Sequence, residues 1–110
     1  MEVTMASSKQ YLAFILDQLS GLDGVSYRQM MGEYILYYQG KIIGGIYDDR
    51  LLIKKTEATN TLLINAPLVP PYAGAKEMLL VEDVDSREHL VQLFNAVFDE
   101  LPPRRKAANA

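Results

Sequence analysis

The sequence predicts an α+β domain. We expect a two-layer sandwich in which an antiparallel sheet of about five strands has helices on one face, in the order α-β-β-β-β-α-β-α. Two observations predict this class. Apolar residues recur at helical spacing near both ends of the chain, and short runs of Val, Ile, Leu and Tyr fill the middle. Short turns separate these runs, and strands joined by links this short must pair antiparallel.

The first predicted helix begins after Ser7 and ends near Gly21. Ser7 and Gln10 have the spacing of a capping box, which satisfies free amide groups at a helix start. One apolar stripe at helical spacing predicts the buried face of this helix: Tyr11, Leu12, Ile15, Leu16 and Leu19. Gly21 is expected to end the helix in the left-handed conformation, which glycine adopts without steric cost.

Four strands follow the first helix, and they are predicted over residues 25–31, 34–38, 42–47 and 51–54. Gln39-Gly40 has the composition of a two-residue hairpin turn, because Gly40 tolerates the positive φ that such turns need. Asp48-Asp49 is expected to form a second tight turn. Gly44-Gly45, inside a strand, indicates either a bulge or a close approach of a neighbouring backbone.

The second half of the chain predicts a short helix, an ordered loop and a fifth strand. Thr56 is expected to cap a helix over residues 57–65, which Pro67 ends. Residues 67–76 hold three prolines and a glycine and are predicted to form the loop. The fifth strand is predicted over residues 78–81.

A capping box formed by Asp85 and Glu88 predicts the start of the last helix. Its apolar stripe is Leu90, Phe94, Val97, Phe98 and Leu101. Pro102-Pro103 is expected to stop this helix. Residues 7–101 are therefore predicted to form a single domain, and residues 1–6 and 102–110 to be flexible tails.

Composition and charge narrow the classes of function. The chain has no cysteine, so disulfides, thiolate chemistry and cysteine-based zinc sites are excluded, and a cytoplasmic location is expected. No apolar run is long enough to span a bilayer, and no signal peptide is recognisable. The net charge of −3 disfavours specific binding to duplex DNA, which usually needs a basic stripe.

Recognisable catalytic motifs are missing from the sequence. His89 is the single histidine, and the G-x-S-x-G elbow of hydrolases does not occur. We interpret His89 as a partly exposed structural histidine, and the acidic residues Glu82, Asp83 and Asp85 as the approach to a helix cap. The chain is therefore predicted to be no enzyme and to hold no cofactor or metal.

The tyrosines of the strand region leave two interpretations open. Every residue from 34 to 38 is apolar or tyrosine, so both faces of this strand carry apolar surface. In the first interpretation helices cover one face and tyrosine hydroxyls reach water from the other. In the second, the face without helices docks a partner, most simply a second copy in a homodimer.

Three segments resemble the TfoX N-terminal domain, named after the bacterial competence regulator TfoX (Sxy): residues 26–41, 45–54 and 70–76. The first contains Ser26-Tyr27-Arg28-Gln29-Met30-Met31-Gly32-Glu33-Tyr34, and the last is Pro70-Pro71-Tyr72-Ala73-Gly74-Ala75-Lys76. The similarity runs from about residue 7 to residue 101. It implies a small bacterial α+β domain that regulates transcription of competence genes through a protein partner, such as the transcription machinery.

Five residues within these segments are expected to contact the partner: Arg28, Tyr34, Tyr38, Tyr72 and Lys76. Arg28 and Lys76 could pair with acidic groups of the partner, or with acids inside the domain. A second hypothesis is a small-molecule sensor or undetected enzyme that uses residues 67–76 as a lid. A flat apolar sheet face favours the protein-binding module, and a deep pocket lined by Tyr, Arg and Lys with shifted pKa values favours the sensor.

Overall fold

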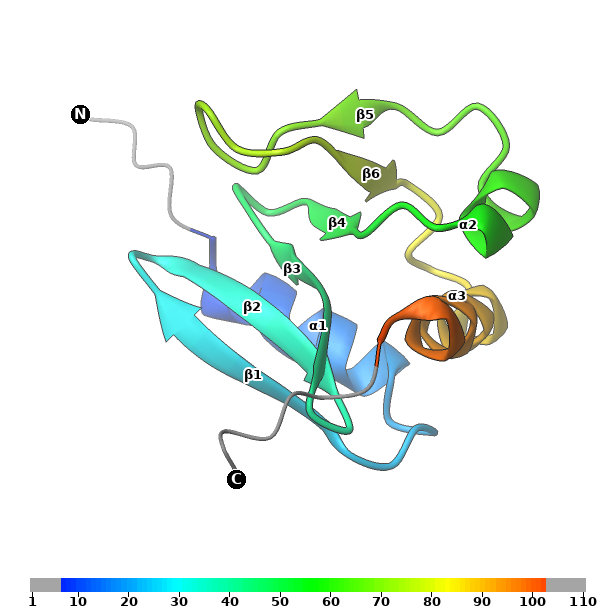
Figure 1. Cartoon of the computed structure of the whole chain (residues 1–110). Helices are drawn as coiled ribbons and strands as arrows, with labels where there is room; N and C mark the ends of the chain where they lie inside the picture. Colours follow the sequence, from blue (N-terminus) through cyan, green and yellow to red (C-terminus); the bar gives the residue numbers. More distant parts are fainter. Residues whose placement is uncertain (1–6, 103–110) are drawn as a thin grey trace, which may run out of the picture.

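One antiparallel sheet and three helices make up the computed structural model, which describes residues 7–102 (Figure 1). The elements are α1 Lys9–Gln18, β1 Val25–Met30, β2 Glu33–Tyr38, β3 Lys41–Ile46, β4 Leu51–Ile53, α2 Glu57–Leu62, β5 Leu68–Val69, β6 Met78–Val81 and α3 Arg87–Glu100. The six strands lie in the order β1-β2-β3-β4-β6-β5. The predicted α+β class is confirmed. The predicted tails lie outside the described residues, apart from Pro102.

The sheet has six strands rather than about five, because part of the predicted loop is a strand. Leu68 and Val69 form β5, which pairs antiparallel with β6. A strand of two residues cannot show an alternating pattern, and the prolines on either side, Pro67 and Pro70, indicate a loop. Proline is compatible with this position because β5 lies at the edge of the sheet, where a missing amide proton breaks no ladder.

Two-residue turns with positive φ join the first four strands. The φ angles are 54° and 84° at Met31-Gly32, 49° and 86° at Gln39-Gly40, and 55° and 54° at Asp48-Asp49. Two successive left-handed residues are the mark of type I′ turns, whose twist matches that of paired strands. The predicted turns at residues 39–40 and 48–49 are confirmed.

Both predicted capping boxes are wrong by one residue. Ser8 caps α1, and its Oγ accepts a hydrogen bond from the Tyr11 amide at 3.1 Å. Ser86 caps α3. The predicted caps were Ser7 and Asp85, which also carry a side-chain oxygen near a helix start. Composition alone does not distinguish adjacent polar residues, because the cap is the residue at which the backbone turns into the helix.

Ser7 instead connects the start of α1 to the tips of two hairpins. Its hydroxyl donates to Glu33 Oε1 at 2.6 Å and accepts from the Asp49 amide at 3.0 Å. The same Glu33 oxygen accepts from the Asp48 amide at 3.1 Å. These bonds hold the β1–β2 side of the sheet and the β3–β4 turn against the first helix.

Two predicted helix ends also differ from the structure. α1 ends at Gln18, and its cap Leu19 has a φ of −97°, so Gly21 does not end the helix in the left-handed conformation. The left-handed glycine is Gly24, with a φ of 94°, whose carbonyl accepts from the Gln39 amide where β1 begins. α2 ends at Leu62 rather than at residue 65.

The core lies between α1, α3 and one face of the sheet. Its buried residues are Leu12, Ile15, Leu19, Tyr34, Leu36, Tyr38, Ile43, Ile46, Leu51, Ile53, Leu79, Val81, Leu90, Leu93, Phe94 and Val97. Burial alternates strictly along β2, so every second residue of that strand points to the helices. The prediction that helices cover one face of the sheet is confirmed.

Strand β3 contains a bulge and two close backbone approaches. Its pairing with β2 shifts register between Leu36 and Tyr37. A Cβ atom on Gly44 would lie 2.1 Å from the Leu52 carbonyl oxygen, and one on Gly45 would lie 2.6 Å from the Tyr34 carbonyl oxygen. Both features that Gly44-Gly45 predicted are therefore present.

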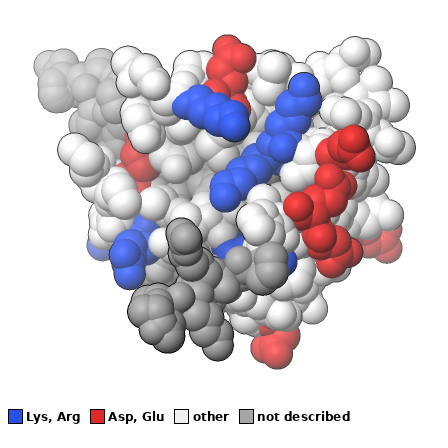
Figure 2. All heavy atoms as spheres, viewed as in Figure 1, with Lys and Arg blue, Asp and Glu red and all other residues white. Residues whose placement is uncertain are grey.

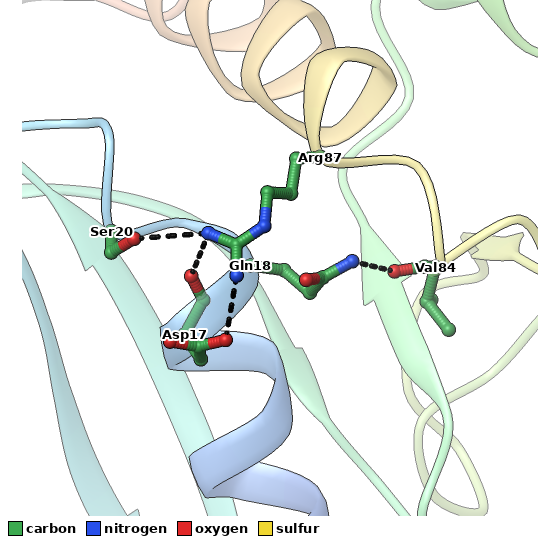
Figure 3. Close-up of polar contacts among 5 residues, drawn as sticks. All are labelled: Asp17, Gln18, Ser20, Val84 and Arg87. Carbon is green, nitrogen blue, oxygen red and sulfur yellow. Dashed lines mark hydrogen bonds and ion pairs between the residues drawn. The ribbon is translucent and has the colours of Figure 1, made fainter.

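Polar contacts join the end of α1 to the start of α3 (Figure 3). The amide of Gln18, which is buried, donates to the Val84 carbonyl at 2.9 Å. Arg87 pairs with the Asp17 carboxylate at 2.8 Å, but both side chains are more than half exposed. Exposed pairs contribute at most about 1 kcal/mol. The buried amide therefore matters more to this contact than the ion pair.

Among residues 7–102, no helix has the length and apolar character needed to cross a membrane.

Candidate functional site

The face of the sheet opposite the helices carries the candidate site. Ile35 and Tyr37 of β2 point to this face, because their neighbours along the strand are buried against the helices. Ile42 of β3 is 38% exposed. In the view of Figure 2, basic side chains cross the upper half of the molecule beside a broad uncharged area, and acidic side chains gather toward one side. We call this surface the helix-free face.

A hollow of about 540 Å³ lies on the helix-free face, between the sheet and the segment that joins β5 to β6. It is lined by Ile35, Ile42, Gly44, Tyr47, Lys54, Lys55, Pro71, Tyr72, Ala75, Lys76, Glu77, Met78 and Leu101. Most of the lining is apolar, and charged residues are the lysines and one glutamate. The volume falls in the range of small-ligand sites, about 300–1,000 Å³.

Positive charge in the hollow comes from Lys54, Lys55 and Lys76. The ion pairs within the described part of the chain are those of Arg87 with Asp17 and of His89 with Asp83, so these lysines have no carboxylate partner there. Unpaired ammonium groups beside apolar surface attract an anion. The hollow is thus a local basic site on a chain whose net charge is −3.

Two side chains of the hollow have shifted pKa values. Burial lowers the pKa of Lys54, and the positive charge of Lys76 lowers it further. Burial also raises the pKa of Tyr47, with smaller contributions from Tyr72 and Glu33. The Tyr47 hydroxyl therefore keeps its proton at neutral pH and can donate a hydrogen bond. Both side chains are therefore partly removed from water, and Lys54 lies close enough to Lys76 for the two charges to repel each other.

We expect Lys76→Met to raise the pKa of Lys54. The substitution removes the nearby positive charge that disfavours the Lys54 ammonium, while the effect of burial stays. An NMR titration of the Lys54 side-chain resonances measures the change. Lys9→Met, which removes an exposed lysine on α1, serves as the control and should leave this pKa unchanged. An unaltered pKa in Lys76→Met would show that the two ammonium groups do not interact.

Of the five residues predicted to contact a partner, the structure brings Tyr72 and Lys76 together at the hollow. Arg28 is exposed on β1 and pairs with Ile35, so it lies on the helix-free face but outside the hollow. Tyr34 and Tyr38 are only 3% and 7% exposed, within the helix-side core. Contact roles for Arg28, Tyr72 and Lys76 remain predictions, whereas the two core tyrosines are buried and offer almost no surface to a partner.

The burial of Tyr34 and Tyr38 has a simple cause. Residues 34–38 are apolar on both faces of the strand, so the sequence does not indicate which of the two faces packs against the helices. Packing decides this, and the Tyr38 hydroxyl finds a partner inside the domain by donating to Asn95 Oδ1 at 2.8 Å. Neither Arg28 nor Lys76 forms an ion pair with an acid among residues 7–102.

Sequence reasoning did not select Lys54, Tyr47 or Met78 as site residues, although they line the hollow. The available signal was weak: Lys54-Lys55 follows an apolar strand, and Lys76 comes 21 residues later near the end of the proline-rich segment. Their proximity depends on how that segment folds over the sheet, and no local pattern encodes this.

His89 connects α3 to α2 and to the turn before α3. Its Nε2 lies 3.1 Å from the Leu62 carbonyl oxygen, and its Nδ1 lies 3.5 Å from Asp83 Oδ2. These contacts agree with the predicted structural role of this residue. No three His, Cys, Asp or Glu side chains converge as metal ligands in the part of the chain that the structure describes.

Fold and site together define a class of protein: a small α+β domain with helices on one face of its sheet and a basic hollow on the other. The chain belongs to the TfoX N-terminal domain family, whose sequence model matches residues 17–99. This match confirms the resemblance that the sequence motifs indicated. It covers all six strands and nearly all of α3.

A related protein from Spirochaeta aurantia, described as an uncharacterized 12.7 kDa protein in the trpE 5′ region, is 38% identical over 80 residues. The aligned part is 73% of this chain and 70% of the relative. No solved structure matches the chain significantly.

Proposed function

We propose that this chain is a non-enzymatic regulatory module that binds an acidic, partly apolar segment of a partner protein in the hollow. The observation that carries this proposal is the arrangement of Lys54, Lys55 and Lys76, without carboxylate partners, around an apolar lining. Carboxylates of the partner pair with the ammonium groups, while its apolar side chains pack on Ile42 and Met78.

Family membership supports a regulatory role linked to competence. We propose that the partner belongs to the cytoplasmic transcription machinery and that Tyr72 and Lys76 contact it. Tyr47 and Tyr72 add apolar area with a polar tip, which suits an interface that is partly wet. Arg28 extends the basic character of the helix-free face beyond the hollow. Binding relieves the repulsion between Lys54 and Lys76 and thereby raises the pKa of Lys54.

The test uses an eight-residue peptide of alternating leucine and glutamate, and the same peptide with glutamine in place of glutamate. We expect the amide chemical shifts of the hollow residues to change on titration with the glutamate peptide. The same shifts should remain unchanged when the glutamine peptide is added. Salt should weaken the binding, because screening acts on partly exposed charges. Equal binding of both peptides would contradict an electrostatic site.

Lys54→Met combined with Lys76→Met should weaken binding of the glutamate peptide by about tenfold, since two partly exposed charge pairs are lost. Lys9→Met changes net charge on the helix side of the molecule and should bind as the unaltered chain does. Methionine keeps most of the apolar stem of lysine, so the fold is retained. If Lys9→Met weakens binding as much, the effect comes from net charge and not from the hollow.

A small-molecule sensor is the second candidate function, favoured by the residues of the segment between β5 and β6 that line the hollow. In this function the segment 67–76 acts as a lid on an apolar anion. The dye anilinonaphthalene sulfonate is such an anion, and N-phenyl-1-naphthylamine is its uncharged analogue. Tight binding of the sulfonate alone, sensitive to Lys54→Met and unaccompanied by peptide binding, would favour the sensor over the protein-binding module.

A further inference from the structure

The two edges of the sheet are built differently. β5, at one edge, has two residues and lies between Pro67 and Pro70. A short edge strand flanked by proline is protected against pairing with another chain. β1, at the other edge, has six residues and no proline, and all of them after Val25 are exposed. It is long, it has no proline, and Arg28 is its one charged residue, so its backbone is open to a further strand.

The backbone of β1 presents hydrogen-bonding groups to that side. The Gly24 carbonyl accepts from the Gln39 amide, so this pair is a hydrogen-bonded one. Hydrogen-bonded and non-hydrogen-bonded pairs alternate along an antiparallel ladder. By this alternation, three residues of β1 direct both backbone groups away from β2: Val25, Tyr27 and Gln29.

We infer that β1 pairs antiparallel with β1 of a second copy, across a two-fold axis centred on Tyr27. The pairing joins the two sheets into one and satisfies the free amide and carbonyl groups of both edges. It goes beyond the proposed function, and the two do not compete, because no residue of β1 lines the hollow.

Charge disfavours a neighbouring register of this pairing, and aromatic contact favours the one centred on Tyr27. An axis through Arg28 would place two guanidinium groups directly opposite each other, which is destabilising. An axis through Tyr27 places Arg28 opposite Ser26 of the other copy and brings the two Tyr27 rings together. The Tyr27 side chain is already ordered for this contact, since its ring packs edge-on against Tyr34 at 5.8 Å while 48% of the residue stays exposed.

A cysteine scan tests the register, because the chain itself has no cysteine. In Tyr27→Cys the two thiols sit on directly opposed residues, about 5.5 Å apart between Cα atoms, which is within disulfide range. Gln29 lies on the same face of the strand as Tyr27. In Gln29→Cys the two cysteines are offset by four residues along the paired strands, which separates them by about 14 Å. We expect oxidised glutathione to convert Tyr27→Cys to a covalent dimer and to leave Gln29→Cys monomeric. Equal crosslinking of both variants, or of neither, would overturn the inference.

Substitutions at Ser26 test the same pairing without removing the tyrosine. Ser26→Glu places a carboxylate opposite Arg28 of the second copy and should tighten the dimer several-fold, whereas Ser26→Arg should weaken it. Ser26 is exposed, so both variants keep the fold. A one-strand interface is small, and sedimentation should therefore reach about 1 mM protein. A monomer at all concentrations, or a shift in the same direction for both variants, would refute the dimer.

Discussion

Gly44→Ala is expected to prevent the domain from folding or to remove most of its stability. A Cβ atom at residue 44 would lie 2.1 Å from the Leu52 carbonyl oxygen and 2.7 Å from the Ile53 Cα. Both atoms belong to the backbone of β4, so no side-chain rotation relieves the overlap. β3 and β4 occupy the middle of the sheet, and separating them breaks the core on both sides. The loss should therefore exceed about 4 kcal/mol, which is exceptional for a single substitution.

Circular dichroism and thermal unfolding measure this effect, and Gly21→Ala is the matched control. A Cβ atom on Gly21 meets nothing within 4 Å, and this residue does not have a positive φ. The same chemical change there should alter stability by less than about 1 kcal/mol, since it mainly restricts the unfolded chain. A Gly44→Ala variant that melts at the temperature of the unaltered chain would show that β3 and β4 can move apart at little cost.

Phe94→Ala should lower the free energy of unfolding by about 3–5 kcal/mol. Phe94 is fully buried on α3, among the helix-side residues that contact the sheet. Alanine would leave a cavity that the surrounding strands cannot fill, because they are held in register by their neighbours. This loss is a large part of the free energy of unfolding of a typical domain, which is roughly 5–15 kcal/mol.

Urea denaturation measures this loss, with Phe14→Ala as the control. Phe14 lies on α1 and is 36% exposed, so its removal takes away less buried surface and opens no closed cavity. We expect the control to lose clearly less stability than Phe94→Ala, with similar dependence on urea in both variants. Equal losses would mean that the α3 contact is not the centre of the core.

The types and order of most elements could be predicted because they depend on local patterns. Amphipathic spacing identified α1 and α3, and Gln39-Gly40 and Asp48-Asp49 identified two hairpin turns. β5 could not be predicted, since Leu68 and Val69 become a strand only by pairing with β6. The helix caps were misplaced by one residue because neighbouring side chains carry the same kind of acceptor.

The candidate site was predictable only in part. Tyr72 and Lys76 were selected from the family-like segment, and both line the hollow. Lys54 was not selected, because its position beside Lys76 arises from how the segment between β5 and β6 folds against the sheet. Tyr34 was predicted to contact a partner but is buried, because its burial depends on which face of the sheet the helices take.

By itself, the sequence determined the α+β class, the antiparallel pairing, the absence of cysteine chemistry and the family, because these follow from composition, from spacing within short segments and from motifs. Only the tertiary structure decided which apolar face of β2 became core, where the lysines meet, and which edge of the sheet stayed open. These features are contacts between segments distant in sequence. Their geometry is set by packing of the whole domain, which no local pattern of residues records.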